Sequence, residues 1–270
     1  SLSIEENWQR ITGIKKNKFI TLIGHDDLLD HHYLEVMDTL IAQHPTATLY
    51  QAHFRFIDSE GKFIRPCKPM QEKESAVAFL SSVLQNRFDL FGTGFMLRSE
   101  DYDREGGIPF YPNLLFADFQ LWMEVTKKGY KATAEKESFS YRLHHSTTKS
   151  SSDLKMQEAF GQFIAYLQSI QQQSPEIDEA IKKYFIGFLG AYSKGLSHRL
   201  IRTPVKERRG LTVDKFLQQS RSYADQLVPE NNYDPYAIKS VKLAALIDRN
   251  LLLNRLYQLF RKIYKRPFLK

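Results

Sequence analysis

Two adjacent aspartates, Asp26 and Asp27, directly follow an apolar stretch, and their types and position could support metal chemistry. The stretch 19–23 is typical of a buried strand, and ligands of open α/β sheets bind beyond the carboxyl ends of the strands. Neighbouring carboxylates repel each other unless a cation offsets their charge. A divalent ion, Mn²⁺ or Mg²⁺, would do so and would bind substrate phosphates as well. The alternative is a plain surface turn or helix cap.

Further candidate residues lie later in the chain. Asp118 and Trp122 are four residues apart in a predicted helix and therefore share a face, and a carboxylate such as Asp118 can act as a general base. Each candidate has a structural alternative: Asp118 as a helix cap, Trp122 as core, His144 as a surface histidine and Gly107 as a turn residue.

The elements that must position these residues fall into two parts. Strand patterns cover 19–23, 47–57, 92–97 and 132–143, and helix patterns cover 30–43, 75–86 and 118–128. Their alternation predicts an α/β layer fold over residues 1–150. From residue 150 the periodicity is helical, with helices expected to begin at Pro175, to cover 213–227 and to begin again at Pro235. We therefore predict an all-helical extension over 151–270.

The bulk composition limits the functional classes. A chain of 270 residues that is 42% hydrophobic can bury a core, which excludes wholesale disorder. The single cysteine, Cys67, excludes an intramolecular disulfide and suits a reducing compartment. Because there is no run of about 18 uncharged apolar residues, no membrane-spanning helix is expected. These features predict a cytoplasmic protein, with a peripheral position on the inner face of the plasma membrane as the alternative.

The net charge of +7 is concentrated at the C-terminal end, because no acidic residue follows Asp248. In the last predicted helix one side is apolar and the other basic. The apolar side carries Leu252, Leu256, Leu259, Phe260 and Ile263, and the basic side carries Arg255, Arg261, Lys262, Lys265 and Arg266. Such a helix suits an anionic membrane surface. The alternative is an ordinary helix packed on the α/β domain with a solvated basic face. No recognition motif favours nucleic acid as a partner.

Five stretches, in order over about residues 7–150, resemble the family-2 glycosyltransferases, which are inverting nucleotide-sugar enzymes of the GT-A fold. The stretches are FITLIGHDDLLDHHYLEVM, TATLYQAHFRFIDSEGKFI, GTGFMLRSEDYDREGGI, LLFADFQLWMEVTKKGYKA and YRLHHSTTKSS. They are similar to that family's metal-binding strand and helix, its next strand and hairpin, its glycine-bearing strand and acceptor-side loop, its Glu-Asp-x-x-Leu-Trp helix and its Tyr-Arg-x-His segment. The resemblance implies a partial GT-A domain, a Rossmann-like nucleotide-diphospho-sugar transferase fold.

By this resemblance, the donor end of the site would include the acidic pair. Asp27 would coordinate the metal that bridges the donor diphosphate, and Asp26 would bind the donor or help to hold the ion. His144 would reach the metal or the diphosphate from the last loop, and Arg142 would balance phosphate charge.

The acceptor end would include Asp118, which the resemblance makes the general base that deprotonates the acceptor hydroxyl. Gly107 and Trp122 would lie on the acceptor side. The implied activity is transfer of a sugar from a nucleotide-diphosphate donor to a saccharide or lipid-linked saccharide, in bacterial-type surface polysaccharide biosynthesis.

The chain also departs from the family pattern. Ala117 stands where the family usually has Glu, and Gly24 stands where a longer Asp-x-Asp-Asp form would have an acid. The acidic pair comes close to the start of the chain, whereas family members first carry a nucleotide-binding half. We therefore expect that half to be missing and the chain alone to be weakly active or inactive.

Two other functions are kept open. A metal-dependent nucleotidyl or phosphoryl transferase could use the same acidic pair, but it would need a phosphate-binding glycine loop or a basic cluster nearby. The nearest basic residues are Lys15, Lys16 and Lys18. The other is a non-catalytic domain that binds a partner or a membrane through its helices.

Overall fold

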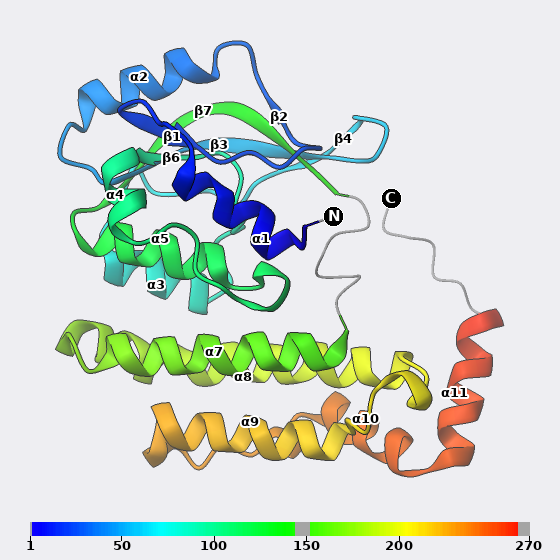
Figure 1. Cartoon of the computed structure of the whole chain (residues 1–270). Helices are drawn as coiled ribbons and strands as arrows, with labels where there is room; N and C mark the ends of the chain where they lie inside the picture. The colour runs from blue at the N-terminus through cyan, green and yellow to red at the C-terminus, as the bar shows by residue number, and fades with distance from the viewer. Residues whose placement is uncertain (1, 144–151, 264–270) are drawn as a thin grey trace. The chain divides into compact units, whose positions relative to one another are not determined.

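The computed structural model describes residues 2–143 and 152–263. The chain divides into two compact units, Ser1–Ser150 and Ser151–Lys270. The first unit combines helices with a sheet and the second is helical (Figure 1), which confirms the predicted α/β class with a helical part. Within the described ranges, no helix combines the length and the apolar character needed to cross a bilayer.

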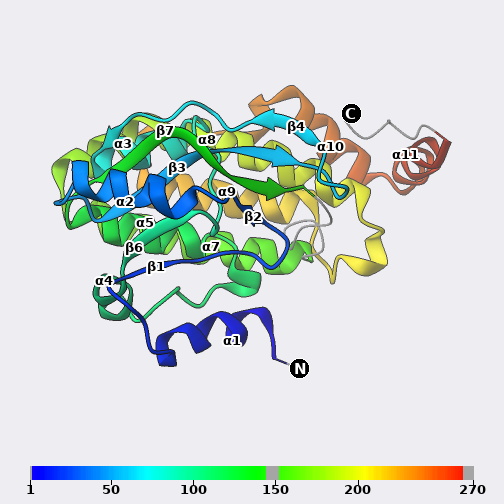
Figure 2. The ribbon, with the colours of Figure 1, turned by 90° about the horizontal axis from the view of Figure 1, so that it is seen from above.

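The first unit is built on a mixed sheet with the strand order β1-β6-β3-β7-β2. Its strands are β1 (Phe19–Thr21), β2 (Leu28–Leu29), β3 (Leu49–Ile57), β4 (Phe63–Pro66), β5 (Lys73–Glu74), β6 (Phe95–Arg98) and β7 (Lys131–Arg142). β3 and β7 are parallel and run side by side, with β1 lying toward α1 (Figure 2). β6 is antiparallel to both β1 and β3, and β2 is antiparallel to β7. Because β3 and β7 are parallel, their C-terminal ends lie together, next to the loop that follows β1.

Helices cover both faces of this sheet. They are α1 (Ile4–Gln9), α2 (Tyr33–Gln43), α3 (Ala76–Leu84), α4 (Ser99–Arg104) and α5 (Ala117–Lys127). α2 lies on one face, and α3 and α5 lie on the other (Figure 1). Ser75 caps α3 by accepting the N–H of Ala78 at 3.2 Å, as expected where a short hydroxyl side chain precedes an apolar helix. The short strands β2 and β5 and the helices α1 and α4 were not predicted from the sequence.

The second unit consists of five described helices and short 3₁₀ turns. The helices are α7 (Asp153–Gln171), α8 (Pro175–Arg202), α9 (Val213–Leu227), α10 (Lys239–Arg249) and α11 (Leu251–Ile263). Phe160 of α7 stacks on Tyr192 of α8 with ring centroids 3.6 Å apart. A buried apolar cluster joins α8, α9 and α10.

The prediction of a single last helix from Pro235 onward is wrong. Pro235 begins a 3₁₀ turn, and α10 and α11 are separate helices that meet at Asn250. The side chain of Asn250 accepts the main-chain N–H groups of Leu252 at 3.0 Å and Leu253 at 3.1 Å. Because an asparagine in this role satisfies the first N–H groups of a new helix, it starts α11 in a new direction.

Candidate functional site

The acidic pair lies in the loop between β1 and β2. Both oxygens of the Asp27 carboxylate accept hydrogen bonds, from the Thr93 hydroxyl at 2.5 Å and from the main-chain N–H of Arg142 at 2.9 Å. The Thr93 hydroxyl in turn accepts the N–H of Gly24 at 3.0 Å. Asp27 is 8% exposed, so these donors offset part of the cost of burying its charge. The loop is therefore tied to β7 and to the segment before β6.

Gly24 explains how the two carboxylates fit beside each other. A Cβ atom at Gly24 would lie 2.8 Å from Oδ2 of Asp27 and 3.1 Å from Oδ1 of Asp26. Both carboxylates thus face the same small space next to the Gly24 Cα, and a side chain there would displace them. This close packing explains why a glycine stands here in place of the first acid of an Asp-x-Asp-Asp form. Oxygens from two carboxylates that face one point suit a single hard cation.

Arg142 brings a positive charge to the same loop. Its Nε–H donates to the carbonyl of Asp26 at 2.9 Å, and its Nη1 donates to the carbonyls of Asp58 at 2.9 Å and Ser59 at 3.2 Å. The guanidinium therefore joins the acidic loop to the turn that follows β3. A cation here also reduces the repulsion between the two carboxylates. Its predicted contact with donor phosphate stays a prediction.

Asp118 is the second residue of α5, and its carboxyl group has a strongly altered acidity. Crowding by protein atoms desolvates the group and raises its pKa to about 6, although the main-chain N–H of Phe119, which donates at 2.8 Å, acts in the opposite direction. Asp118 is not the N-cap: that position is Phe116, which makes no side-chain capping bond. A carboxyl group with a pKa near neutrality is suited to general acid–base work.

The segment that leads into Asp118 has an unusual backbone. Asn113, Leu114 and Phe116 have φ angles of 54°, 55° and 69°, which are in the left-handed region. Large residues rarely adopt these angles, and such conformations persist only where the surroundings impose them. One such constraint is Glu5 of α1, whose Oε1 accepts the N–H of Asn113 at 2.7 Å. Backbone strain of this kind concentrates at functional sites.

Tyr141, near the end of β7, links the acidic groups in space. Burial raises the pKa of its hydroxyl to about 12, and the negative charges of Asp27, Asp26 and Asp118 add to this increase. All three carboxylates are therefore close enough to act on one phenol. The expectation that the acidic pair and Asp118 belong to the donor and acceptor ends of one site stays a prediction.

The segment before β6 connects the same groups through direct contacts. Phe91 stacks on Tyr141 with centroids 3.7 Å apart, and its carbonyl accepts the indole N–H of Trp122 at 3.3 Å. Two residues later, Thr93 holds Asp27. Phe91 and Thr93 were not predicted as site residues, and Tyr141 was named only as part of the Tyr-Arg-x-His segment. The glycines on both sides of Thr93 were one signal, since the ring of Phe139 closely approaches Gly94.

Of the two acceptor-side expectations, that for Trp122 needs correction, and that for Gly107 stays a prediction beside a structural role. Trp122 is fully buried and stacks on Phe95 with centroids 4.6 Å apart, so its ring has no surface to offer a sugar and belongs to the core. Gly107 has a φ of +83°, and a Cβ there would lie 2.6 Å from Cγ2 of Thr12. Turn geometry and close packing after α4 account for this glycine.

The remaining predicted ligand, His144, lies outside the described residues. Within residues 2–143 and 152–263, no three His, Cys, Asp or Glu side chains gather as a self-sufficient metal cluster. A cation at the acidic pair would therefore need oxygen ligands from a substrate or from other groups, as Mg²⁺ sites that bind substrate phosphates do.

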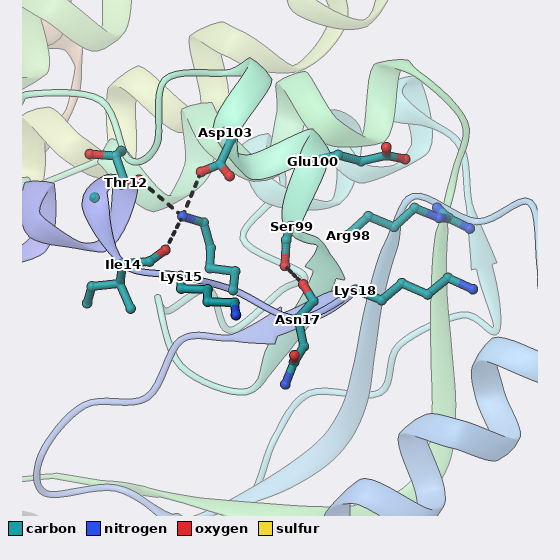
Figure 3. Close-up of a pocket in the computed structure, with 11 residues that line it drawn as sticks. Thr12, Ile14, Lys15, Asn17, Lys18, Arg98, Ser99, Glu100 and Asp103 are labelled. Atoms are coloured by element: carbon teal, nitrogen blue, oxygen red, sulfur yellow. Dashed lines mark hydrogen bonds and ion pairs between the residues drawn. The ribbon is translucent and has the colours of Figure 1, made fainter.

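A groove of about 770 Å³ lies at the opposite end of β1, lined by residues 12–18 and 98–100 and by Asp103 (Figure 3). Lys16 is bound to Asp103 at 2.9 Å, and Arg98 donates to the carbonyls of Ala47 at 2.7 Å and Pro45 at 2.6 Å. Lys16 and Arg98 are therefore bound to groups of the protein, and β1 separates the groove from the acidic pair.

Comparison with models of known protein families found no match for this chain, and a search of curated proteins found no significant match. The residues and their geometry therefore have to indicate the function. Asp26 and Asp27 face one point, and Arg142 is bonded to their loop. The charges of both carboxylates and of Asp118, whose pKa is near 6, act on Tyr141. Such a set could bind a cation with an anionic ligand and accept a proton.

Proposed function

We propose that the first unit carries the catalytic centre of a metal-dependent, inverting glycosyltransferase of the GT-A type. It would move a sugar from a nucleotide-diphosphate donor to a hydroxyl group of a saccharide or lipid-linked saccharide. The observation that carries the proposal is that the carboxylates of Asp26 and Asp27 meet beside Gly24 and that their charges and that of Asp118 all act on Tyr141. The five stretches that resemble family-2 glycosyltransferases add to it, because the same three aspartates occupy that family's functional positions.

Asp26 and Asp27 would hold Mg²⁺ or Mn²⁺ together with the donor diphosphate. A bound ion of this kind neutralises the charge that develops on a departing diphosphate. The hydrogen bonds from Thr93 and from the N–H of Arg142 keep the Asp27 carboxylate oriented. Partners that orient a metal ligand contribute strongly to metal affinity. The Arg142 guanidinium adds positive charge at the edge where the phosphates would lie.

Asp118 would take the proton from the attacking hydroxyl. With a pKa of about 6, its carboxyl group is largely ionised at neutral pH and yet basic enough to accept a proton in the transition state. The sign of the pH dependence follows: transfer should increase as the pH rises through about 6, because the base must be deprotonated. The strained segment before α5 would keep the carboxylate in place.

The phosphoryl-transferase alternative is less well supported. It would need cations at the transferred phosphate, whereas Lys15, Lys16 and Lys18 precede β1 and the acidic pair follows it. Lys16 is also bound to Asp103 and to three main-chain carbonyls. This leaves Arg142 as the described basic side chain bonded to the acidic loop.

Two binding measurements test the proposal without requiring turnover. Calorimetric titration of the full chain with Mn²⁺ should show binding that Asp27→Asn abolishes and that Asp118→Asn keeps. Thermal unfolding with Mn²⁺ and UDP-sugars should show stabilisation with the same dependence on the two variants. Asp38→Asn, at an exposed position of α2, is the matched control and should behave as wild type.

Three results would argue against the proposal. Mn²⁺ binding that Asp27→Asn leaves unchanged would place the ion elsewhere. UDP-sugar stabilisation that does not need the metal would separate the donor from the acidic pair. Absence of both effects, with binding to vesicles retained, would favour a non-catalytic interaction domain.

A further inference from the structure

α11 contacts the rest of the helical unit through its polar side. Asn254 is 6% exposed, the Gln258 side chain donates to the carbonyl of Ile201 at 2.6 Å, and Arg261 donates to the carbonyl of Arg202 at 2.8 Å. These positions are four and three residues apart, so they share one face of the helix. The carbonyls that Gln258 and Arg261 bind belong to the last turn of α8, where no helical N–H is available. α11 thus stands at the end of the helical unit (Figure 1).

The apolar side of α11 faces away from these contacts. Its exposed fractions are 65% for Leu252, 52% for Leu256, 56% for Leu259, 58% for Phe260 and 86% for Ile263. Helices of globular proteins normally turn such a stripe toward the core. An ordinary packed helix would bury its apolar side, whereas the stripe of α11 is exposed. Arg255 and Arg261 are exposed as well, as expected of a solvated basic face.

The charged residues of this helix and of the chain after it have one sign. Residues 249–270 contain seven lysines and arginines and no aspartate or glutamate. Arg255 is exposed on α11, at a position that borders the stripe, and Lys239 and Lys242 are exposed on α10. A surface that complements an apolar stripe with cations beside it must be apolar and negatively charged.

We propose that the α11 stripe, defined as Leu252, Leu256, Leu259, Phe260 and Ile263, docks on a lipid bilayer that contains anionic headgroups. The stripe would enter the boundary between headgroups and acyl chains, and the arginines and lysines would contact lipid phosphates. This inference is independent of the proposed reaction, since it concerns the helical unit and none of the residues around Tyr141.

A second copy of the chain is a poorer occupant of this surface. In a two-fold dimer the same patch meets itself. The cations of one α11 would then face those of the other, and no acidic residue of 249–270 could pair with them. A bilayer with anionic lipids supplies both the apolar layer and the opposite charge.

Flotation of the full chain with vesicles tests the inference. Wild-type protein should float with vesicles of phosphatidylcholine and phosphatidylglycerol and much less with phosphatidylcholine alone. The double variant Leu256→Ser/Leu259→Ser should bind the anionic vesicles at least about tenfold more weakly than wild type, because two leucines no longer enter the bilayer. Arg255→Gln should lose about fivefold on anionic vesicles, as expected for one cation near such a surface.

Leu34→Ser is the matched control, because Leu34 of α2, at 68%, is a leucine even more exposed than Leu256 and Leu259 and lies in the first unit. It should float as wild type does. The serine variants change exposed side chains, so their circular dichroism should match that of wild type. Failure of the wild type to float, equal loss in Leu34→Ser, or a dimer in light scattering that the double variant dissociates would each overturn the proposal. None of these results would change the outcome expected for the Mn²⁺ titration, which concerns the first unit.

Discussion

Replacing Asp118 by asparagine should stabilise the first unit at neutral pH and not at low pH. The pKa of the group is 3.8 in its unperturbed state and about 6 in the folded protein. Folding therefore favours the protonated form, and the associated stability is lost as the pH rises from about 4 through 6. Asparagine keeps the acceptor for the Phe119 N–H and never ionises.

The magnitude follows from the size of the pKa shift. Each unit corresponds to about 1.4 kcal/mol, so a shift of about two units sets an upper limit of about 3 kcal/mol. Because Asp118 is partly exposed, water screens part of this cost, and we expect about 1–3 kcal/mol above pH 7. Near pH 4 the wild type and the variant should differ little.

Urea unfolding followed by tryptophan fluorescence measures this difference. Both tryptophans, Trp8 and Trp122, lie in the first unit, so the signal reports the unit that contains Asp118. Unfolding curves at several pH values from 4.5 to 8 give the difference in the free energy of unfolding. Asp38→Asn, the same change at an exposed site, should stay within about 0.5 kcal/mol at every pH.

A difference in the free energy of unfolding that does not depend on pH would refute the reasoning, since the cost of burying a carboxylate arises only when the group is ionised. Lower stability of Asp118→Asn at pH 8 would refute it as well. That result would mean that the ionised form is favoured by partners and would remove the physical basis for a base with a pKa near 6.

Three further changes have defined outcomes. Thr93→Val removes the hydroxyl that serves both a buried carboxylate and the N–H of Gly24, so urea unfolding should show a loss of about 1–3 kcal/mol, and Thr93→Ser should recover most of it. Gly24→Ala should displace the acidic pair and weaken Mn²⁺ binding about 10–100-fold in calorimetry, whereas Gly13→Ala, where a Cβ meets nothing within 4 Å, should not. Lys131→Met should cost about 3–5 kcal/mol in urea unfolding, because it leaves the buried Glu74 carboxylate, bound at 2.8 Å, without its cation. The double variant with Glu74→Gln should be clearly less destabilised than the sum of the two single changes, and simple additivity would contradict this account.

Local patterns were sufficient for most regular elements. The cap at Ser174 and the proline after it begin α8 as predicted, and α9 has the predicted bounds. Patterns were insufficient where a strand is very short or where one side chain changes the outcome. β2 has two residues and exists only through its pairing with β7. Asn250 divides the last helix by binding N–H groups that a continuous helix would have used otherwise.

The candidate site was partly accessible from the sequence. Asp26 and Asp27 stand out because two like charges directly after an apolar strand are a local anomaly. Asp118 and Trp122 share a helix face by spacing, yet the tryptophan is fully buried and the aspartate is partly exposed, since their surroundings differ at the two ends of a turn. Tyr141 belongs to the Tyr-Arg-x-His segment, but its position relative to the carboxylates depends on the pairing of β7 and could not be predicted locally.

The amino-acid order alone settles which residues can ionise, which stretches alternate and where helices start, because these properties arise between near neighbours in the chain. The folded arrangement settled what each of these residues faces. Hydrogen bonds from α11 to the last carbonyls of α8 turn the apolar stripe outward, although its period equally suits a buried face. Packing of distant segments around Asp118 desolvates its carboxyl group and raises its pKa, and the charges of Asp26, Asp27 and Asp118 all act on Tyr141, since these effects act through space.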